Sequence, residues 1–140
     1  MRLEVLIPHV RGQGRPRAVV RGKHAGVYTH KDDGAYRGEV VYLTRLAMDA
    51  QGLTEPMDGP LRLTLDVFYA RPKSVSFKRR PLPTVKPDLS NIIKAIEDAL
   101  NGVAIVDDAA IVELVASKVY GPSPLVRVLV ESIGLARPVQ

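Results

Sequence analysis

The sequence predicts an α+β fold in which a mixed β-sheet of about five or six strands packs with two helices. The first observation is a set of segments in which apolar and polar residues alternate, the period of a strand buried on one face. The second is a pair of segments whose apolar residues recur at helical spacing. The third is the length, because 140 residues can bury one core without disulfides, and the chain has no cysteine. We therefore expect a single domain over residues 1–140.

The first part of the chain is predicted to form a strand, a loop and a short hairpin. Residues 2–8 alternate and predict the first strand. Glycines and a proline within residues 11–17 then break regular structure, and the arginines of this loop can hold phosphate oxygens in bidentate pairs. Residues 18–21 and 26–29 are expected to pair as short strands around a turn.

The middle of the chain is predicted to contain a long helix, the clearest strand and a long loop. Residues 30–51 have apolar residues at i, i+4, i+7 and i+11, which predicts a structural helix. Residues 61–69 alternate cleanly, and Asp66 points away from the apolar face as a solvated or paired surface acid. Residues 70–87 contain four prolines and six basic side chains. Such a long loop favours a functional, flexible arm.

A second predicted helix begins near Asp88. The proline before Asp88 disfavours helical geometry at Lys86, and the short polar side chain of Asp88 suits a helix N-terminus. Between residues 91 and 100 the apolar side chains fall on one side, while Lys94 and Glu97 lie on the opposite side. One face of this helix is therefore expected to join the core, and the other is available for chemistry.

Two adjacent carboxylates, Asp107 and Asp108, stand at the start of a strand expected over residues 109–120, which a turn joins to a last strand over 125–133. Mg²⁺ prefers hard oxygen ligands and is typically held by one or two carboxylates together with phosphate oxygens. This pair and Asp88 therefore predict a magnesium site. The alternative is that Asp88 only caps the helix and that the pair is a solvated turn. Alternation does not settle which aspartate faces the metal, because strand twist and bulges intervene.

The charge distribution favours an anionic partner. The formal net charge is +5, and the basic residues gather in two segments that contain no acid. We expect the following side chains to bind the phosphates of a nucleic acid: Arg15, Arg17, Arg71, Lys73, Lys78, Arg79, Arg80 and Lys86. Ordinary solubilising charge is the alternative interpretation.

Several other classes of protein are disfavoured. No apolar run approaches the length of a membrane span, and the N-terminus lacks the pattern of a signal peptide, so we expect a cytoplasmic protein without membrane contact. The three histidines lack metal-ligand spacing, and their expected place is the surface or a phosphate contact. A P-loop is absent from the sequence, so no nucleotide cofactor is expected.

Several motifs occur in a characteristic order along the chain. They are Gly12-Gln13-Gly14-Arg15-Pro16-Arg17, Tyr28-Thr29, Arg71-Pro72-Lys73-Ser74, Lys86-Pro87-Asp88-Leu89-Ser90-Asn91, Lys94, Asp98-Ala99-Leu100-Asn101-Gly102 and Asp107-Asp108. In this order they resemble the RusA family of Holliday junction resolvases, DNA endonucleases common in bacteria and their prophages. The resemblance implies a homodimer that acts on a four-way DNA junction. The hairpin of the basic N-terminal segment is also expected to contact DNA.

The resemblance also implies roles for individual residues. Asp88 and Asp108 match acidic residues that bind magnesium in the family, with Mn²⁺ as a possible substitute, and Asp107 is a neighbour of less certain role. Lys94 matches a lysine that assists. Ser90 departs from the pattern, because the best-known form of the motif has an aspartate there. A serine hydroxyl can bind a metal through a water but brings no negative charge.

Glu97 is predicted to supply the missing carboxylate. It lies two helical turns from Ser90 on the same stripe, and its longer side chain can reach back toward the helix start. The alternative is an exposed glutamate that pairs with a lysine.

The sequence thus predicts a Mg²⁺-dependent endodeoxyribonuclease that resolves Holliday junctions by paired cuts in DNA recombination and repair. Mg²⁺ would polarise the scissile phosphate and lower the pKa of the attacking water, and Lys94 would neutralise charge in the transition state. Two alternatives stay open. One is a junction- or duplex-DNA-binding protein that cuts weakly or not at all because of Ser90. The other is a nuclease for other branched or single-stranded DNA or for RNA.

Overall fold

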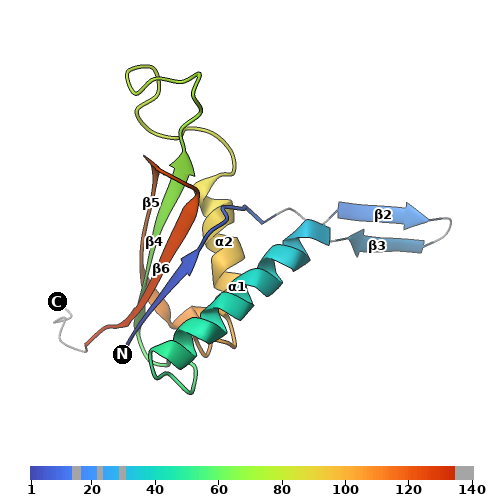
Figure 1. Cartoon of the computed structure of the whole chain (residues 1–140). Coiled ribbons are helices and arrows are strands. Elements are labelled where there is room, and N and C mark those ends of the chain that lie inside the picture. The colour runs from blue at the N-terminus through green and yellow to red at the C-terminus, as the bar shows by residue number, and fades with distance from the viewer. Residues whose placement is uncertain (14–16, 22–23, 29–30, 135–140) are drawn as a thin grey trace, which may run out of the picture.

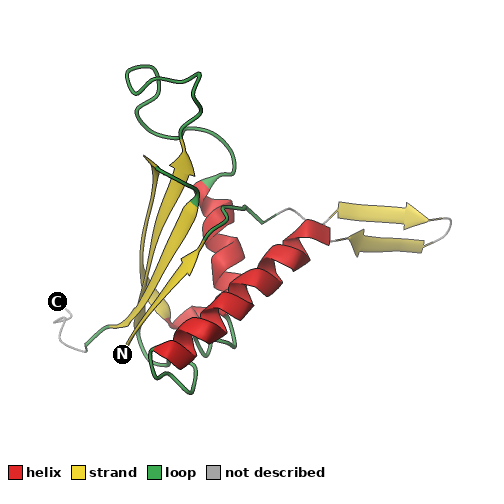
Figure 2. Ribbon diagram, in the orientation of Figure 1, coloured by secondary structure: helices red, strands yellow, loops and turns green. Residues whose placement is uncertain are grey.

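A four-stranded sheet with two helices on one face and a separate two-stranded hairpin make up the protein (Figures 1 and 2). The computed structural model describes residues 1–13, 17–21, 24–28 and 31–134. The elements in chain order are β1 Arg2–Ile7, β2 Arg17–Arg21, β3 His24–Tyr28, α1 Lys31–Ala50, β4 Leu61–Ala70, α2 Leu89–Leu100, the 3₁₀ turn η1 Asp108–Ala110, β5 Ile111–Gly121 and β6 Leu125–Ser132. The α+β class with two helices is confirmed.

The main sheet is mixed, as predicted, with the strand order β1-β6-β4-β5. β1 pairs with β6 and β6 with β4 in antiparallel fashion, whereas β4 and β5 are parallel. The expectation of five or six strands in one sheet is wrong in one respect. β2 and β3 are five residues each and pair only with one another in the described part of the chain. Figure 1 shows this hairpin projecting from the body beyond the start of α1.

The core lies between the sheet and the two helices. Every second residue of β4 from Leu61 to Val67 is fully buried, as the alternation predicted. On the helix side, Val40 of α1 and Ile92 and Ile96 of α2 are also 0% exposed. Burying one such side chain stabilises the fold by roughly 1.5–3 kcal/mol. Packing of these apolar faces therefore holds both helices on the sheet.

The opposite face of the sheet carries ion pairs in place of helices. Arg127 of β6 binds Asp66 of β4 and Glu4 of β1, with N–O distances of 3.1 Å each. Arg62 binds Glu113 of β5 at 3.2 Å. Asp66 is thus a paired surface acid, which is what its position in the strand predicted.

β5, the strand that runs parallel to β4, begins at Ile111, later than the sequence predicted. Residues 108–110 form a 3₁₀ turn, which the Asp107 side chain caps by accepting a hydrogen bond from the Ala109 N–H at 3.1 Å. The β4–β5 register then shifts between Leu61 and Arg62, so that Val112 has no partner of its own in β4. Inward- and outward-facing residues therefore do not alternate strictly from residue 109, because the capped turn and a β-bulge interrupt the strand.

The loop between β4 and α2 is built around Arg71. Its guanidinium donates hydrogen bonds to the carbonyls of Ser76, Arg80 and Pro81. The same group lies 4.0 Å from the centre of the Tyr120 ring. The sequence predicted a flexible arm here. The structure shows a loop with internal hydrogen bonds, because one half-buried planar cation satisfies several carbonyls at once.

Neither α1 nor α2, the two long helices of the described chain, has the length and apolar character that a bilayer crossing requires.

Truncation of Leu65 should destabilise the protein strongly. Leu65 lies on β4 and is 0% exposed, so Leu65→Ala leaves a cavity and should lower the free energy of unfolding by about 2–5 kcal/mol. Leu6→Ala removes the same atoms from a strand position that is 51% exposed, and should cost less than about 1 kcal/mol. Urea unfolding of both variants measures the difference. Equal losses would contradict the placement of the core.

Candidate functional site

Asp88 occupies the N-cap of α2, but its carboxylate is not used for capping. The backbone of Asp88 is extended, with φ −65° and ψ 143°, and its carbonyl accepts the N–H groups of Asn91 and Ile92. Within the described residues, its side chain makes no capping hydrogen bond. The exposed carboxylate is therefore available to a ligand. This observation disfavours the alternative in which Asp88 serves only as a cap.

A shallow cleft of about 440 Å³ opens beside Asp88. It is lined by Val10, Arg11, Gly12, Lys86, Pro87, Asp88 and Asn91. The segment after β1 crosses the start of α2 here, and the Gln13 N–H donates to the Asn91 carbonyl at 3.1 Å. One carboxylate and two cationic side chains thus share the cleft. The Arg11 guanidinium is paired with Asp33 at 3.1 Å, whereas Lys86 is exposed beside Asp88, where it can meet a phosphate group.

Glycine is required where these two segments meet. A Cβ atom at Gly12 would lie 2.8 Å from the Cβ of Pro87 and 3.1 Å from the Cβ of Asn91. These distances are shorter than van der Waals contact, so any larger residue would push the first segment away from the helix start. The glycine of the Gly12-Gln13-Gly14 motif therefore sets the shape of the cleft.

Side chains near the C-terminal ends of β4 and β5 form hydrogen bonds with the chain just before Asp88. The Tyr69 hydroxyl donates to the Pro87 carbonyl at 3.0 Å. The Lys118 ammonium donates to the carbonyls of Val85 at 2.7 Å and Pro87 at 3.2 Å, and lies 5.2 Å from the centre of the Tyr69 ring. Burial raises the pKa of Tyr69, and the negative charge of Asp88 raises it further.

Sequence reasoning missed Lys118 and Tyr69. The alternation of β5 did contain a signal for Lys118. This residue falls on the same face of the strand as Leu114 and Ala116, the face that the helices cover. A lysine on the covered side of a strand needs partners for its ammonium group.

A second group of acids gathers at the other end of α2. Glu97 and Asp98 lie in its last turns, and Asp107 and Asp108 lie at the adjacent turn η1. Burial raises the pKa of Glu97, and so do the charges of Asp108 and Asp98. Glu97 therefore lies near Asp108, another predicted ligand, at the end of α2 opposite to the helix start that its side chain was expected to approach.

The two adjacent aspartates are not equivalent. The Ala109 N–H lowers the pKa of Asp107, and a hydrogen bond with the Asp108 carboxyl lowers it further. That same hydrogen bond raises the pKa of Asp108, as do burial and the charges of Asp107 and Asp98. Because Asp107 is engaged in capping, Asp108 has the more available carboxylate of the pair.

The structure does not bring Asp88 to this acidic end within one chain. Nine residues separate Asp88 from Glu97, which is about 14 Å along a helix that rises 1.5 Å per residue. Mg²⁺ binds oxygens at about 2.0–2.1 Å, so one ion cannot contact both side chains. In the part of the chain that the structure describes, no group of three or more His, Asp or Glu side chains is arranged to hold a metal. Glu97 and Asp108 suit a hard cation together with water and phosphate oxygens, whereas Asp88 does not join them.

The predicted basic residues fall into several environments. Lys94 is exposed on α2, between Asp88 and the acidic end. Lys73, Lys78, Arg79 and Lys86 are exposed on the loop before α2, and Arg80 is half-buried there. Arg71 differs, because loop carbonyls already occupy its guanidinium. Arg15 lies outside the described residues, and Arg17 lies in β2 with its side chain not described.

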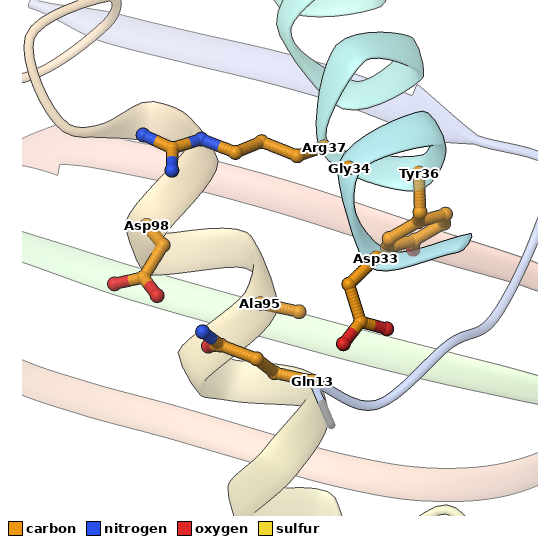
Figure 3. A pocket seen from close by; sticks show the side chains of 7 residues that line it. All are labelled: Gln13, Asp33, Gly34, Tyr36, Arg37, Ala95 and Asp98. Carbon is orange, nitrogen blue, oxygen red and sulfur yellow. The ribbon is translucent and has the colours of Figure 1, made fainter. Parts of the chain in front are cut away.

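A narrow crevice between α1 and α2 has a volume of about 110 Å³ (Figure 3). Its lining includes Gln13, Asp33, Arg37 and Asp98, and Figure 3 shows Arg37 extending from α1 toward α2. Typical small-molecule sites have volumes of about 300–1,000 Å³. The crevice is therefore too small for a nucleotide.

Comparisons with known proteins give two findings. A family model described as endodeoxyribonuclease RusA matches residues 8–131. A protein of Bacillus subtilis (strain 168), the uncharacterized protein YqaN, is 31% identical over 130 residues, which cover 86% of this chain and 89% of that protein. The family match includes the start of α2, the acidic end and strands β4 and β5.

Gly12→Ala should damage the cleft, whereas a glycine substitution on α1 should not. The new methyl group of Gly12→Ala collides with Pro87 and Asn91, so we expect a loss of about 1–3 kcal/mol in the free energy of unfolding. Among the described atoms, none lies within 4 Å of a Cβ built at Gly38. Gly38→Ala should therefore stabilise α1 by about 0.5–1 kcal/mol. Urea unfolding distinguishes the two, and equal stability of both variants would show that the contact is absent.

Proposed function

The chain belongs to the RusA family of endodeoxyribonucleases, and from this membership we propose that it resolves four-way DNA junctions as a Mg²⁺-dependent homodimer. The observation that supports this most is the uncapped, exposed carboxylate of Asp88, at the family's motif and beside a basic cleft. A helix that needed Asp88 only for stability would use its side chain as a cap.

Each candidate residue has a task in this proposal. Glu97 and Asp108 supply hard oxygen ligands at one end of α2 and Asp88 supplies one at the other, while Asp107 shapes the turn that carries Asp108 by accepting a hydrogen bond from the Ala109 N–H. Lys94 projects from the same helix into solvent, where its charge can stabilise negative charge on the phosphate in the transition state. Bound Mg²⁺ would supply polarisation of the phosphate and a more acidic water.

Lys118 has a positioning task. Its ammonium group binds the carbonyls of Val85 and Pro87, just before Asp88, and lies 5.2 Å from the centre of the Tyr69 ring. These contacts determine where α2 begins and hence where the Asp88 carboxylate lies. The residue acts on Asp88 through the backbone and is not expected to touch DNA.

Two parts of the molecule that project away from the core are proposed to bind DNA. The β2–β3 hairpin projects from the body in Figure 1, and the loop after β4 exposes Lys73, Lys78 and Arg79. Phe77 is 70% exposed on the same loop, where an aromatic ring can stack on an unpaired base. Arg71 acts within the loop, because it holds the carbonyls that shape it.

A second candidate function is binding without efficient cleavage. Ser90 is exposed one residue into α2, where the best-known form of the motif has an aspartate. One fewer negative charge at the helix start weakens metal affinity unless another carboxylate substitutes. A synthetic four-way junction separates the two functions, because a binder retards the junction in a gel without producing nicked duplexes.

Asp88→Asn should abolish cleavage and preserve junction binding. Removing one charged ligand should lower the cleavage rate by at least about 100-fold, the scale of losing one electrostatic contact in a transition state. Chelation of metal from the parental protein should have the same effect. Asp49→Asn, at an exposed position of α1, is the matched control and should cleave normally. Cleavage by Asp88→Asn at the parental rate would overturn the proposed role.

Glu97→Gln tests whether this glutamate replaces the family's missing aspartate. We expect cleavage to fall by about 10–100-fold, and to recover partly at higher Mg²⁺ concentration because the lost charge weakens metal affinity. Glu55→Gln, an exposed position between α1 and β4, serves as the control. An unchanged cleavage rate for Glu97→Gln at every Mg²⁺ concentration would show that Glu97 is not a metal ligand and is only a surface residue of the helix.

A further inference from the structure

A second cleft, here called the aromatic cleft, lies between the loop after β4 and the end of β5, and has a volume of about 440 Å³. Apart from Arg71 its lining is apolar or aromatic, it includes the rings of Phe77 and Tyr120, and none of the described residues that form it is acidic. Typical small-molecule sites have volumes of about 300–1,000 Å³. The aromatic cleft therefore has room for a flat group of the size of a nucleobase.

The apolar side chains at the mouth of the aromatic cleft are exposed on a hydrogen-bonded turn. Phe77 is 70% exposed and Leu82 is 54% exposed. Ser76 closes the turn that carries Phe77, because its carbonyl accepts the Arg80 N–H at 3.0 Å and its Oγ accepts the Arg79 N–H at 3.3 Å. The backbone of this turn thus presents an aromatic ring to the outside.

Arg71 links the two rings of the aromatic cleft. Its guanidinium lies 4.0 Å from the centre of the Tyr120 ring and 5.6 Å from the centre of the Phe77 ring. The N–H groups of the same guanidinium donate to three loop carbonyls, which hold the cation in this position. The cleft is therefore formed before a ligand arrives, and a preformed site loses less entropy when it binds.

The charge around the aromatic cleft favours a nucleic acid over an apolar peptide. Residues 70–87 contain six basic side chains and no acid. Lys78 and Arg79 follow Phe77 directly in the sequence, and both are exposed, as is Lys73. Proteins that bind single-stranded nucleic acids combine such cations, which bind phosphates, with aromatic rings on which bases stack. An apolar peptide would leave the cations without phosphates.

The aromatic cleft adjoins the Asp88 end of the candidate site. Tyr120 lies two residues after Lys118 on the same face of β5, about 7 Å along the strand. Lys118 in turn binds the carbonyl of Pro87, the residue before Asp88. Successive nucleotides of one DNA strand are about 3.4 Å apart along a duplex. A strand with a phosphate beside Asp88 therefore reaches the aromatic cleft within a few nucleotides.

We propose that the aromatic cleft takes one unpaired nucleobase of the DNA substrate, stacked on Phe77, and thereby selects branched DNA over fully paired duplex. A paired base leaves the duplex stack only at a cost in free energy, and this cost is smallest where pairing is already disturbed, as at a branch point or a bulge. The inference rests on the proposed function, since it concerns the same DNA substrate. It adds the structural feature of that substrate that is recognised.

A tryptophan introduced by Phe77→Trp reports the stacking directly. The chain has no tryptophan of its own, so the emission of this variant comes from the aromatic cleft alone. With metal chelated, so that no strand is cut, a four-way junction and a duplex with a one-base bulge should each quench the emission by about twofold or more. A fully paired duplex should bind without quenching. Tyr42→Trp, at a 63% exposed position of α1, is the control and should keep its emission.

Unchanged emission of Phe77→Trp with bound junction and bulged duplex would overturn the proposal, and so would equal quenching by the paired duplex. The measurement needs no cleavage. A protein that is quenched selectively but cuts no junction would fail as a nuclease while retaining the base site. A protein that cuts junctions without selective quenching would lose only the base site.

Affinity measurements test the same contact without a fluorescent probe. Phe77→Ala should weaken binding of the bulged duplex and the junction by about 10–100-fold, the size of one base–aromatic stack, and leave the affinity for paired duplex within about twofold. Phe77→Tyr keeps a ring and should keep the preference. Tyr42→Ala removes an equally exposed ring from α1 and should bind all three DNAs normally. Equal weakening of all three by Phe77→Ala would make Phe77 a general DNA contact and overturn the proposal.

Discussion

The packing of α2 on the sheet is the constraint on which the rest of the structure depends. Ile92, Ile96 and Leu100 are fully buried, so one face of the helix is fixed against the core. Each contributes roughly 1.5–3 kcal/mol, more than the roughly 1 kcal/mol of an N-cap. The helix therefore does not need the Asp88 side chain for stability. The same packing keeps Lys94 and the acids on the exposed side.

A rigid helix also acts as a spacer. With α2 held along its length, Asp88 and Glu97 stay about 14 Å apart, and no side-chain movement brings them to one ion. One end of α2 therefore presents Asp88 beside the cleft, and the other end presents Glu97 close to Asp108.

The structure distinguishes two roles that the sequence left open for its aspartates. Asp107, predicted as a neighbour of the ligand Asp108, caps a turn, whereas the side chain of Asp88, predicted as a ligand, does not cap its helix. Arg71 similarly belongs to a basic segment but binds its own loop. In each case the spacing of residues was informative, but the choice between roles depended on which backbone groups lay within reach of the side chain.

Local patterns in the sequence determined both helices, the strands of the main sheet and the acidic and basic segments, because periodicity and helix boundaries depend on neighbouring residues. The family motif added the identities of Asp88, Lys94 and Asp108. Only the tertiary structure decided that Arg71 lies against the Tyr120 ring and that Lys118 holds the chain before Asp88. Those features join residues far apart in the sequence. Such contacts depend on strand order and register, which the period of a strand does not encode.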